Sequence, residues 1–422
     1  MVYATWPARP ELGLLAGTDL FARTMYESSE IPPHWAAQLN HARAVIVASH
    51  YVADVFQACG VTAPIYVVPD GVDPDIYPYQ ERPSRAGLTT LMVGMMQPRK
   101  NYREGVAAWQ EAFDDVPDAR LIIKSKQGWT DGFVSDDPRI QIDTSSEPTQ
   151  GIIHWYKQAD VLMALGSEGF GIPLIEGMAT GLPVIALDAM GQADVCSEAG
   201  DLVLSVKPSA WRSHWHYGTT NVCGEVPVPG VADIVAKLRW VTQHHDEAVD
   251  LGRAASSWVH RNRNVWNYGP DVLAVVEEHT GTRRPVRHRG FPTIDRPLRR
   301  ARQPARSSLA RSGNSVRRGT LLQDDDNSKR PPLWSFRLAG NSSLGIVTLW
   351  TPQIEKWAWQ HAADKRSYCE QHGFSFYGYG DVLEPSRAAT WSKIPALQRH
   401  LSDHEWLLWT DADAAIVNFE FD

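Results

Sequence analysis

Two glutamates, Glu168 and Glu176, stand with seven residues between them in the stretch SEGFGIPLIEGMATGLPVIA, which begins at Ser167. Glu168 precedes a glycine-containing loop, and Glu176 lies about one turn into the helix that Pro173 suits as a first residue. The free backbone N–H groups and the positive dipole end at such a helix start attract anions. Two carboxylates there would repel phosphate but would bind sugar and ribose hydroxyls. The spacing is equally consistent with a Glu176 that only complements the helix dipole and a solvated Glu168.

A second anion site is indicated where the chain reads GMMQPRKN, from Gly94 to Asn101. Asn101 is a suitable N-cap for a following helix, and Glu104 stands where a capping box has its acid. Arg99 and Lys100 would then project at a helix N-terminus, where two cations oppose the dipole and invite an anion. The alternative is a solvated basic turn.

Two aspartates, Asp411 and Asp413, follow the apolar run in EWLLWTDAD near the end of the sequence. Residues i and i+2 of an extended chain face the same side, so the two carboxylates can converge. Hard oxygen ligands at a strand end suit Mg²⁺ or Mn²⁺ that bridges to substrate phosphates. An ordinary acidic turn is the alternative, because isolated pairs of this kind are common.

The elements that must position these residues alternate between strand and helix, which predicts α/β architecture with parallel sheets covered by helices. Ser49 is the expected cap of a helix running to Gly60. Further along, Gly181 and Pro183 end the helix that follows Pro173. The strands expected in the first part of the chain are Ala44–Ser49, Ile65–Val68, Thr89–Val93, Leu121–Lys124, Val161–Ala164 and Val184–Leu187. Those expected near the end are Gly345–Leu349, Phe374–Tyr377 and Trp406–Thr410, with helices near Glu355–His372 and Lys393–His400.

Composition excludes several classes of function. The net charge of −8 and a pI near 6.0 argue against a nucleic-acid-binding protein, so no nucleic-acid partner is expected. The four cysteines form no CxxC pair, which favours reduced thiols over zinc ligation or a disulfide framework. The sequence shows no signal peptide and no apolar stretch near the roughly 18 residues that span a bilayer. A cytoplasmic location is expected.

One segment, residues 281–340, differs from the rest. Twelve arginines and the single acid Asp295 occur between Arg283 and Arg318, interleaved with Pro, Ser and Gly. Such a composition cannot bury enough apolar surface to offset its chain entropy, so it predicts a disordered linker. Its charge is consistent with peripheral attraction to anionic lipid at the inner face of a membrane, and equally with a solvated spacer.

The stretch ADVLMALGSEGFGIPLIEGMATGLPVIA, with its EX7E spacing, resembles glycosyltransferase family 4, whose members have the GT-B fold of two Rossmann-like lobes and retain anomeric configuration. The similarity runs from about Thr24 to His279 and includes the interlobe crossover VVPDGVDP, Val67–Pro74. The resemblance implies that Glu168 contacts the donor sugar beside its reacting carbon and that Glu176 contacts the nucleotide ribose. It further implies that the amides of Phe170, Gly171 and Ile172 hold sugar or phosphate groups.

By the same resemblance, Lys100 neutralises the leaving diphosphate, with Gly94 beside it, and no metal cofactor is needed. Relatives often have Arg directly after the glycine, where this chain has Met95, so we expect Arg99 to substitute. A histidine common in relatives is absent near Tyr26–Glu27, and no catalytic role is assigned there. Only about 75 residues precede the crossover, which implies a partial first lobe.

The later segments IVTLW, YCEQHGFSFYGYG, TWSKIPALQRHL and EWLLWTDADAAI resemble glycosyltransferase family 34, of GT-A fold, over about Leu344 to Asp422. Here the resemblance implies that Asp411 and Asp413 bind a metal–nucleotide sugar, with Mn²⁺ or Mg²⁺ as cofactor. Trp391 and Lys393 fall in the stretch associated with the donor. The match implies only the start of a GT-A domain, since the chain stops nine residues after the motif.

Together the two resemblances predict a retaining glycosyltransferase that uses a UDP- or GDP-linked sugar and a glycan or lipid-linked acceptor, and that carries two transferase units. The expected domains are a partial acceptor lobe (1–84), a donor-binding lobe (85–280), the linker (281–340) and a partial GT-A domain (341–422). A non-catalytic nucleotide-sugar-binding or scaffold protein is the alternative, and a GT-B epimerase or phosphorylase is a third option.

Overall fold

The computed structural model divides the chain into two compact units. The larger unit is Ala4–Gln303, and the smaller unit is Pro304–Asp422 together with Met1–Tyr3. The expected disorder of the linker falls mainly outside the described part of the chain, and Trp391 and Asp413 lie wholly outside it. The described residues are 2–4, 20–82, 88–126, 128, 130–145, 149–215, 222–281, 299–300, 336–338, 344–351, 355–383, 385 and 392–412.

A small parallel sheet opens the larger unit, in the order β2, β3, β4, with β13 antiparallel to β4. Every residue of β3 is buried, as expected of a strand covered on both faces. The elements here are β2 (Phe21–Arg23), α1 (Pro33–Leu39), β3 (Ala44–Val47), α2 (His50–Ala58), β4 (Ile65–Val67) and β13 (Arg299–Arg300), and the short strand β1 (Val2–Ala4) falls at the division between the two units.

Helix α2 begins where the sequence predicts, because Ser49 caps it. The Ser49 hydroxyl accepts a hydrogen bond from the Val52 N–H at 3.3 Å, which satisfies one of the free donors of the first turn. The same hydroxyl donates to the carbonyl of Gly169 at 2.7 Å. The cap therefore also ties the first sheet's helix to the glycine-containing loop that follows Glu168.

The chain crosses between the two sheets of the larger unit twice, and the two crossings lie side by side. The Val72 N–H donates to the Arg263 carbonyl at 2.8 Å, and the Val265 N–H donates to the Val72 carbonyl at 3.0 Å. A Cβ at Gly71 would stand 2.6 Å from the Arg263 carbonyl oxygen, so glycine is required for this approach. The crossover predicted over Val67–Pro74 thus pairs through backbone hydrogen bonds with the second crossing, at Arg263–Val265.

The second sheet has six parallel strands in the order β10-β9-β8-β5-β6-β7. The chain adds β6 and β7 on one side of β5 and then returns to add β8 on the other side. The carboxyl ends of β5 and β8 therefore form the switch point at which open α/β sheets bind ligands. The strands are β5 (Thr89–Val93), β6 (Arg120–Lys124), β7 (Ile140–Asp143), β8 (Val161–Ala164), β9 (Val184–Leu187) and β10 (Leu204–Val206).

Successive residues of these strands enter two different cores, one on each face. Leu91 and Leu162 join a cluster with Tyr156 and Met178. Their neighbours along the strands, such as Met92, join a separate cluster on the other face. Burial on both faces explains why these strands read as continuous apolar runs.

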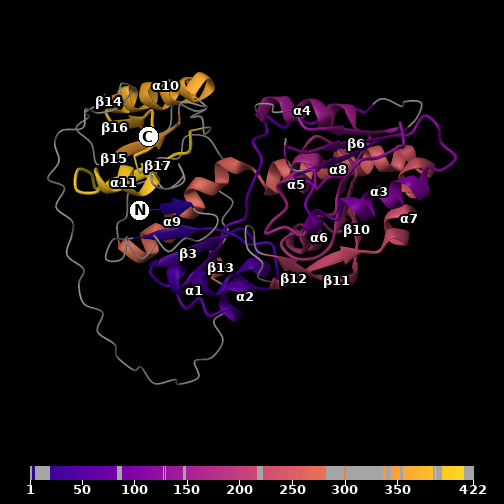
Figure 1. Ribbon diagram of the computed structural model, residues 1–422, viewed down its shortest axis with the longest axis horizontal. Helices are drawn as coiled ribbons and strands as arrows, with labels where there is room; N and C mark the ends of the chain where they lie inside the picture. The colour runs from indigo at the N-terminus through magenta and orange to yellow at the C-terminus, as the bar shows by residue number, and fades with distance from the viewer. Residues whose placement is uncertain are drawn as a thin grey trace. The chain divides into compact units, whose positions relative to one another are not determined.

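Helices cover both faces of the second sheet. Helices α3 and α7 contribute to the core that contains Met92, and they lie side by side in Figure 1. Helices α4, α5, α6 and α8 contribute to the opposite core. The ranges are η2 (Pro98–Lys100), α3 (Tyr102–Ala112), α4 (Thr149–Gln158), α5 (Ile172–Ala179), α6 (Gln192–Ala199), η3 (Gly200–Leu202), α7 (Val231–Gln243), α8 (His245–Asn262), η4 (Val265–Asn267) and α9 (Tyr268–Thr280).

An antiparallel hairpin of β11 (Pro208–Trp215) and β12 (Val222–Pro229) stands between β10 and α7. This hairpin is not predicted from the sequence, because the run from Pro208 has no clean alternation and no short glycine turn of the kind that marks a tight hairpin.

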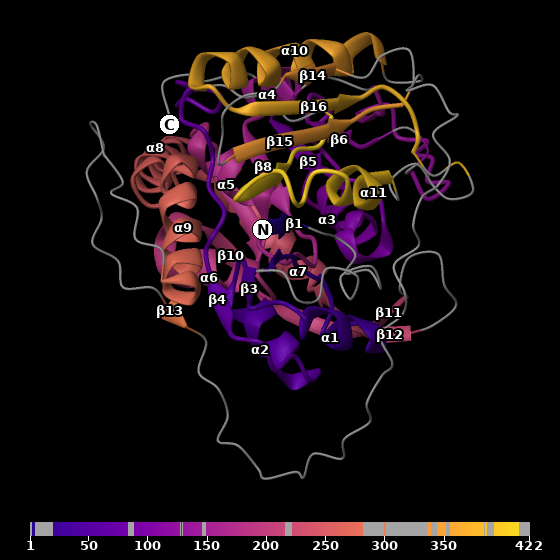
Figure 2. The same cartoon turned by 90° about the vertical axis from the view of Figure 1, so that its left-hand side faces the viewer.

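The smaller unit contains a four-stranded sheet in the order β14-β16-β15-β17, with β15 parallel to both neighbours and β14 antiparallel to β16. Helix α10 packs on this sheet through a core that includes Trp350 and Phe376, and Figure 2 shows it lying along β16. The predicted elements are present here as β15 (Leu344–Leu349), α10 (Glu355–His372), β16 (Ser375–Tyr379), α11 (Lys393–Gln398) and β17 (Trp406–Trp409). Strand β14 (Phe336–Leu338) is not predicted from the sequence. Within the described residues, no helix has the length and hydropathy needed to cross a membrane.

The contact between α8 and the end of α5 gives a stability test. A methyl group at Gly252 would overlap with the carbonyl oxygen of Gly181, which is backbone and cannot rotate away. Gly252→Ala should therefore lower the free energy of unfolding by about 1–3 kcal/mol, despite alanine's better helix propensity. Urea denaturation measures the change. Gly269→Ala on α9 is the control, since a Cβ there meets nothing within 4 Å. A Gly252→Ala protein as stable as this control would contradict the packing described.

Candidate functional site

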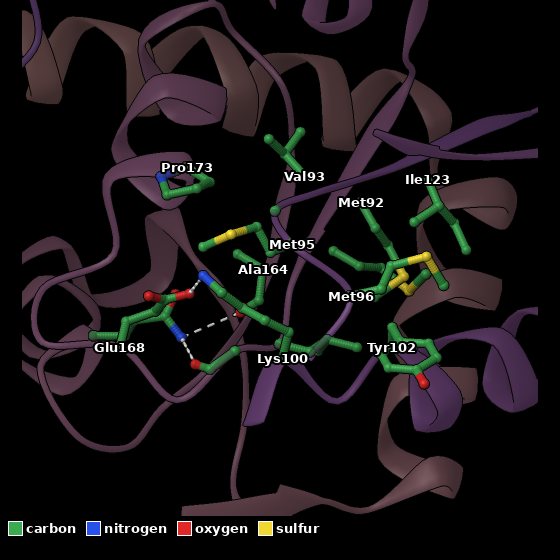
Figure 3. Close-up of a pocket in the computed structure, with 15 residues that line it drawn as sticks. Met92, Val93, Met95, Met96, Lys100, Tyr102, Ile123, Ala164, Glu168 and Pro173 are labelled. Atoms are coloured by element: carbon green, nitrogen blue, oxygen red, sulfur yellow. Dashed lines mark hydrogen bonds and ion pairs between the residues drawn. The ribbon is translucent and has the colours of Figure 1, made fainter. Parts of the chain in front are cut away.

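A small pocket opens at the carboxyl ends of β5 and β8, the switch point of the six-stranded sheet (Figure 3). Backbone from both strand ends contributes to its wall, as do the first turns of α5 and α6. The lining residues are Met92, Val93, Gly94, Met95, Met96, Lys100, Tyr102, Ile123, Met163, Ala164, Leu165, Gly166, Glu168, Pro173 and Gln192.

The charged groups of this pocket are Lys100 and Glu168, which form an ion pair through Lys100 Nζ and Glu168 Oε1. Figure 3 shows the two side chains pointing toward one another. Gly94 stands beside the pair at φ 137°, a backbone conformation that favours glycine, although a Cβ there would meet the Lys100 ammonium only at an ordinary contact distance of 3.5 Å. A Cβ at Gly166 would stand 2.5 Å from Glu168 Oε1. The pair thus depends on the absence of a side chain at Gly166.

Burial acts on both members of the pair. Their side chains are 15% and 14% exposed, so each charge has lost most of its water. Burial lowers the pKa of Lys100, and the Glu168 carboxylate opposes that change. Burial alone would raise the pKa of Glu168, but the adjacent Lys100 and Arg99 outweigh it and lower that pKa. The carboxylate is therefore held in its charged form by the cations beside it.

Arg99 differs from the expectation that it faces the anion site with Lys100. Its side chain is 5% exposed, and Arg99 is not one of the described residues that line the pocket. Its guanidinium donates to the Ser167 carbonyl at 2.6 Å and lies 3.4 Å from Glu168 Oε2. On its other side it stands 3.3 Å from Glu27 Oε1. Arg99 therefore contacts Glu168 and links it, through Glu27, to the part of the chain that forms the first sheet.

The predicted capping box at Asn101 and Glu104 is wrong. Helix α3 does follow Asn101, but this residue is left-handed, at φ 52°, and its side chain caps no N–H. The Asn101 amide instead donates to the carbonyls of Leu165, at 2.8 Å, and Pro227, at 2.9 Å. Glu104 pairs with Arg212 at 2.6 Å. Tertiary partners have taken both side chains from the local interaction that the sequence pattern favours.

The first turn of α5 lies beside the pocket, as predicted. Gly171 is left-handed, at φ 104°, and a Cβ there would stand 2.7 Å from Gln192 Cγ. The Phe170 ring is 1% exposed and belongs to the hydrophobic core, so a ligand role would fall to its backbone. Ile172 opens the helix and Pro173 lines the pocket. The phosphate-binding role of these amides stays a prediction.

Glu176 is 9% exposed, and two tyrosine hydroxyls donate to its carboxylate. Tyr77 donates to Oε1 and Tyr156 donates to Oε2, each at 2.6 Å. Burial raises the pKa of Glu176, which these two hydrogen bonds oppose. The carboxylate therefore joins α4 and the segment after the crossover to α5. A ribose would have to share or displace these hydrogen bonds.

In the smaller unit, Asp411 follows β17 as predicted. Its Oδ1 accepts hydrogen bonds from Lys393 Nζ, at 2.6 Å, and from Trp409 Nε1, at 2.9 Å. Its side chain is 59% exposed. Partial loss of water around this exposed carboxylate would raise the pKa of Asp411, but the hydrogen bonds from Lys393 and Trp409 outweigh that effect and lower the pKa. Lys393 and Asp411, both predicted donor-site residues, are thus brought together.

A divalent cation fits this strand end in part. Asp411 supplies one charged carboxylate, the ligand type that Mg²⁺ and Mn²⁺ prefer. The paired Asp413 lies outside the described residues. Within the part of the chain that the structure describes, no three His, Cys, Asp or Glu side chains gather closely enough to hold a metal. The two donors to Asp411 Oδ1 are the Lys393 ammonium and the Trp409 indole N–H. A substrate phosphate could also accept hydrogen bonds from these groups.

The structure adds four residues to this site that sequence reasoning missed. Glu27 contacts Arg99, Tyr77 and Tyr156 hold Glu176, and Arg212 holds Asn101 and Glu104. Each lies at least 20 positions from its partner along the chain, so no local spacing in the sequence predicts the contact. The one sequence signal for any of these residues was Glu27 itself, an acidic residue near the position where relatives have a histidine.

Two families match parts of this chain. Residues 87–213 match the family described as "Glycosyl transferases group 1". Residues 349–422 match the "galactosyl transferase GMA12/MNN10 family". The first match contains Lys100 and Glu168, and the second contains Lys393 and Asp411.

Curated relatives match over short regions. A serotype-specific mannosyltransferase, WbdA, of Escherichia coli is 32% identical over 111 residues, which cover 24% of this chain and 14% of that protein. The probable glycosyltransferase 6 of Oryza sativa subsp. indica is 36% identical over 61 residues, 14% of this chain and 13% of that protein. A D-inositol 3-phosphate glycosyltransferase of Segniliparus rotundus is 28% identical, over 35% of this chain and 38% of that protein. The matched regions thus span about one seventh of the first two relatives.

Solved structures share the fold. A glycosyltransferase from Rickettsia africae matches with a TM-score of 0.51 and 16% identity, covering 66% of this chain and 76% of that one. TarM matches with a TM-score of 0.50 and 11% identity, covering 65% of this chain and 54% of that one. These likenesses support the two-sheet α/β architecture of the larger unit.

The buried Glu176 gives a second test. Tyr156→Phe removes one of the two hydroxyls that donate to this carboxylate, and it should lower the free energy of unfolding by about 1–3 kcal/mol. Chemical denaturation measures the loss. Tyr51→Phe, on the half-buried Tyr51 of α2, is the matched control and should change stability little. If the two variants lose equal stability, the hydrogen bond from Tyr156 to Glu176 does not stabilise the folded protein more than an ordinary tyrosine hydroxyl does.

Proposed function

We propose that this chain transfers sugars from nucleotide sugars to an acceptor, because residues 87–213 match the group 1 glycosyltransferase family and residues 349–422 match the GMA12/MNN10 galactosyl transferase family. The donors are UDP- or GDP-linked, and the acceptor is a glycan or a lipid-linked glycan. The observation that carries the proposal is the buried Lys100–Glu168 pair at the switch point of the parallel sheet.

Lys100 suits the leaving group. When the bond between the anomeric carbon and the diphosphate oxygen breaks, the electron pair stays with the diphosphate and negative charge builds up there. A cation that has already lost its water stabilises this charge without reorganising. The acceptor hydroxyl oxygen forms the new bond to the anomeric carbon, and its proton passes to the departing diphosphate oxygen, which has gained the electron pair of the broken bond. The first turn of α5 supplies further N–H donors for the same anion.

Glu168 suits the sugar. It is charged, buried and fixed between Lys100 and Arg99, so it can accept hydrogen bonds from sugar hydroxyls and stabilise positive charge at the reacting carbon. Retention of configuration and a ribose contact for Glu176 follow the family resemblance. We assign the donor side to residues 85–280 and the acceptor side to residues 1–84. Arg99 acts here through Glu168.

A second transfer activity is proposed for the smaller unit. Asp411, with Asp413, would hold a divalent cation, which when bound neutralises the diphosphate of the donor. Lys393, 2.6 Å from Asp411, would contact the same phosphates. If the acceptor is lipid-linked, the arginines of the 281–340 segment would favour an anionic membrane surface such as the inner face.

Lys100→Ala and Glu168→Gln should each lower the transfer rate by about a hundredfold, because each removes a charge that the transition state uses. The assay is the release of UDP or GDP from a panel of nucleotide sugars with glycan acceptors, with the anomeric configuration of the product read by NMR. Lys126→Ala, at an exposed lysine after β6, is the control. Unchanged turnover in both site variants would refute the assignment, as would tight binding of a nucleotide sugar without any product.

The two proposed sites should differ in their need for metal. In an Asp411→Asn protein, UDP or GDP binding at the Lys100 site should survive EDTA, because a cation and a helix N-terminus replace the metal. In a Lys100→Ala protein, the remaining nucleotide-sugar binding should require Mn²⁺ or Mg²⁺. Calorimetry measures both. Loss of the first binding in EDTA, or metal-independent binding in the second protein, would mean that one of the sites is misassigned.

A further inference from the structure

We propose that the β11–β12 hairpin is a positioning element for the diphosphate site, and that Arg212 is the residue through which it holds Lys100 in place. The proposal rests on the function proposed for Lys100. It adds a residue that lies outside the described lining of the pocket and belongs to a different supersecondary element.

One side of the hairpin is fixed to the segment after β2. The Ser28 hydroxyl donates to the Cys223 carbonyl at 2.6 Å, and the Ser29 N–H donates to the Glu225 carbonyl at 3.0 Å. At Gly224, with φ 71°, a Cβ would stand 2.6 Å from the Glu30 nitrogen. This contact between backbones leaves the hairpin little freedom to move relative to that segment.

The other side of the hairpin holds Asn101. This residue is fully buried, and its amide donates to the Pro227 carbonyl of β12 at 2.9 Å. From β11, Arg212 Nη2 donates to Asn101 Oδ1 at 2.7 Å and to Glu104 Oε1 at 2.6 Å. A single guanidinium nitrogen thus serves two acceptors at the start of α3.

Lys100 depends on Asn101 because the two are adjacent and Asn101 adopts a left-handed backbone. Asparagine tolerates this conformation better than most residues, but it still requires support from its surroundings. The side-chain contacts of Asn101 supply that support. If they weaken, the backbone at Asn101 can relax, and the direction in which the preceding Lys100 leaves the chain changes with it. The distance between Lys100 and Glu168 then changes as well.

The same segment after β2 also contacts Ser167 and Arg99, which neighbour Glu168 and Lys100 in the sequence. The Ser167 hydroxyl donates to the Glu27 carbonyl at 2.7 Å, and Glu27 faces Arg99. The hairpin therefore contacts the segment that carries Lys100 directly, through Asn101, and is linked to the segment that carries Glu168 only through the segment after β2.

Strand β11 supplies a matched control. The Arg212 side chain is 30% exposed and faces Glu104, whereas its neighbour Trp211 is 50% exposed. Both substitutions shorten a large side chain in the same strand. Only the one at Arg212 removes contacts with Asn101.

The test measures UDP and GDP binding to the full chain by calorimetry in EDTA, together with the melting temperature. Arg212→Ala should weaken diphosphate binding roughly tenfold, and Arg212→Lys, which keeps a cation for both acceptors, should recover most of the affinity. Trp211→Ala should bind as the unaltered chain does. Equal weakening by Trp211→Ala would show that the hairpin acts only through general stability and would overturn the proposal.

A double-mutant cycle with Lys100→Ala separates positioning from stability. If Arg212 acts through Lys100, Arg212→Ala should cause no further loss of diphosphate affinity in the Lys100→Ala protein. An undiminished further loss would overturn the positioning role while leaving the proposed function intact. If Lys100→Ala alone leaves diphosphate binding unchanged, the proposed function fails, and the positioning proposal fails with it. If Arg212→Ala does not fold, Arg212→Gln, which shortens the side chain and removes its charge, carries the same cycle, and an undiminished further loss there overturns the positioning role in the same way.

Discussion

The larger unit depends on one constraint, which is that the charges of Lys100 and Glu168 are buried together at the ends of two parallel strands. Burial of either charge without the other would be costly, so both backbones must be fixed well enough to keep the pair formed. The glycine at position 166 and the guanidinium of Arg99 serve this requirement directly. A ligand that carries negative charge can then compete for a cation that is already desolvated and in place.

Several long-range contacts converge on the same pair. The cap of α2 holds the loop after Glu168 through the Gly169 carbonyl. Glu27 reaches Arg99 from the first sheet's part of the chain, and the hairpin reaches Asn101 from the other side. These contacts join elements that are far apart in sequence. The pocket is thus a property of the whole larger unit, and its loops are held by residues outside it.

Much of the fold could be predicted from sequence, because periodicity and helix signals are local. Strand β5 and helix α10 have the predicted bounds, and the cap at Ser49 forms as expected. The capping box at Asn101 failed although its pattern was equally good. Arg212 and two backbone carbonyls offered these side chains partners in the folded state that a local pattern cannot contain. The pairing of β11 with β12 was missed because it depends on the elements that the hairpin packs against in the folded structure.

The sequence by itself determined the α/β class, the positions of the glycine-containing loops and the residue types available for a diphosphate and a sugar. It did so because strand, helix and turn preferences depend on near neighbours. Only the tertiary structure decided that Lys100 faces the pocket while Arg99 turns away from it, and that Glu176 receives hydrogen bonds from Tyr77 and Tyr156. Side-chain direction in a buried site is set by which distant groups share the available space and satisfy the buried charge, and that information is absent from local spacing.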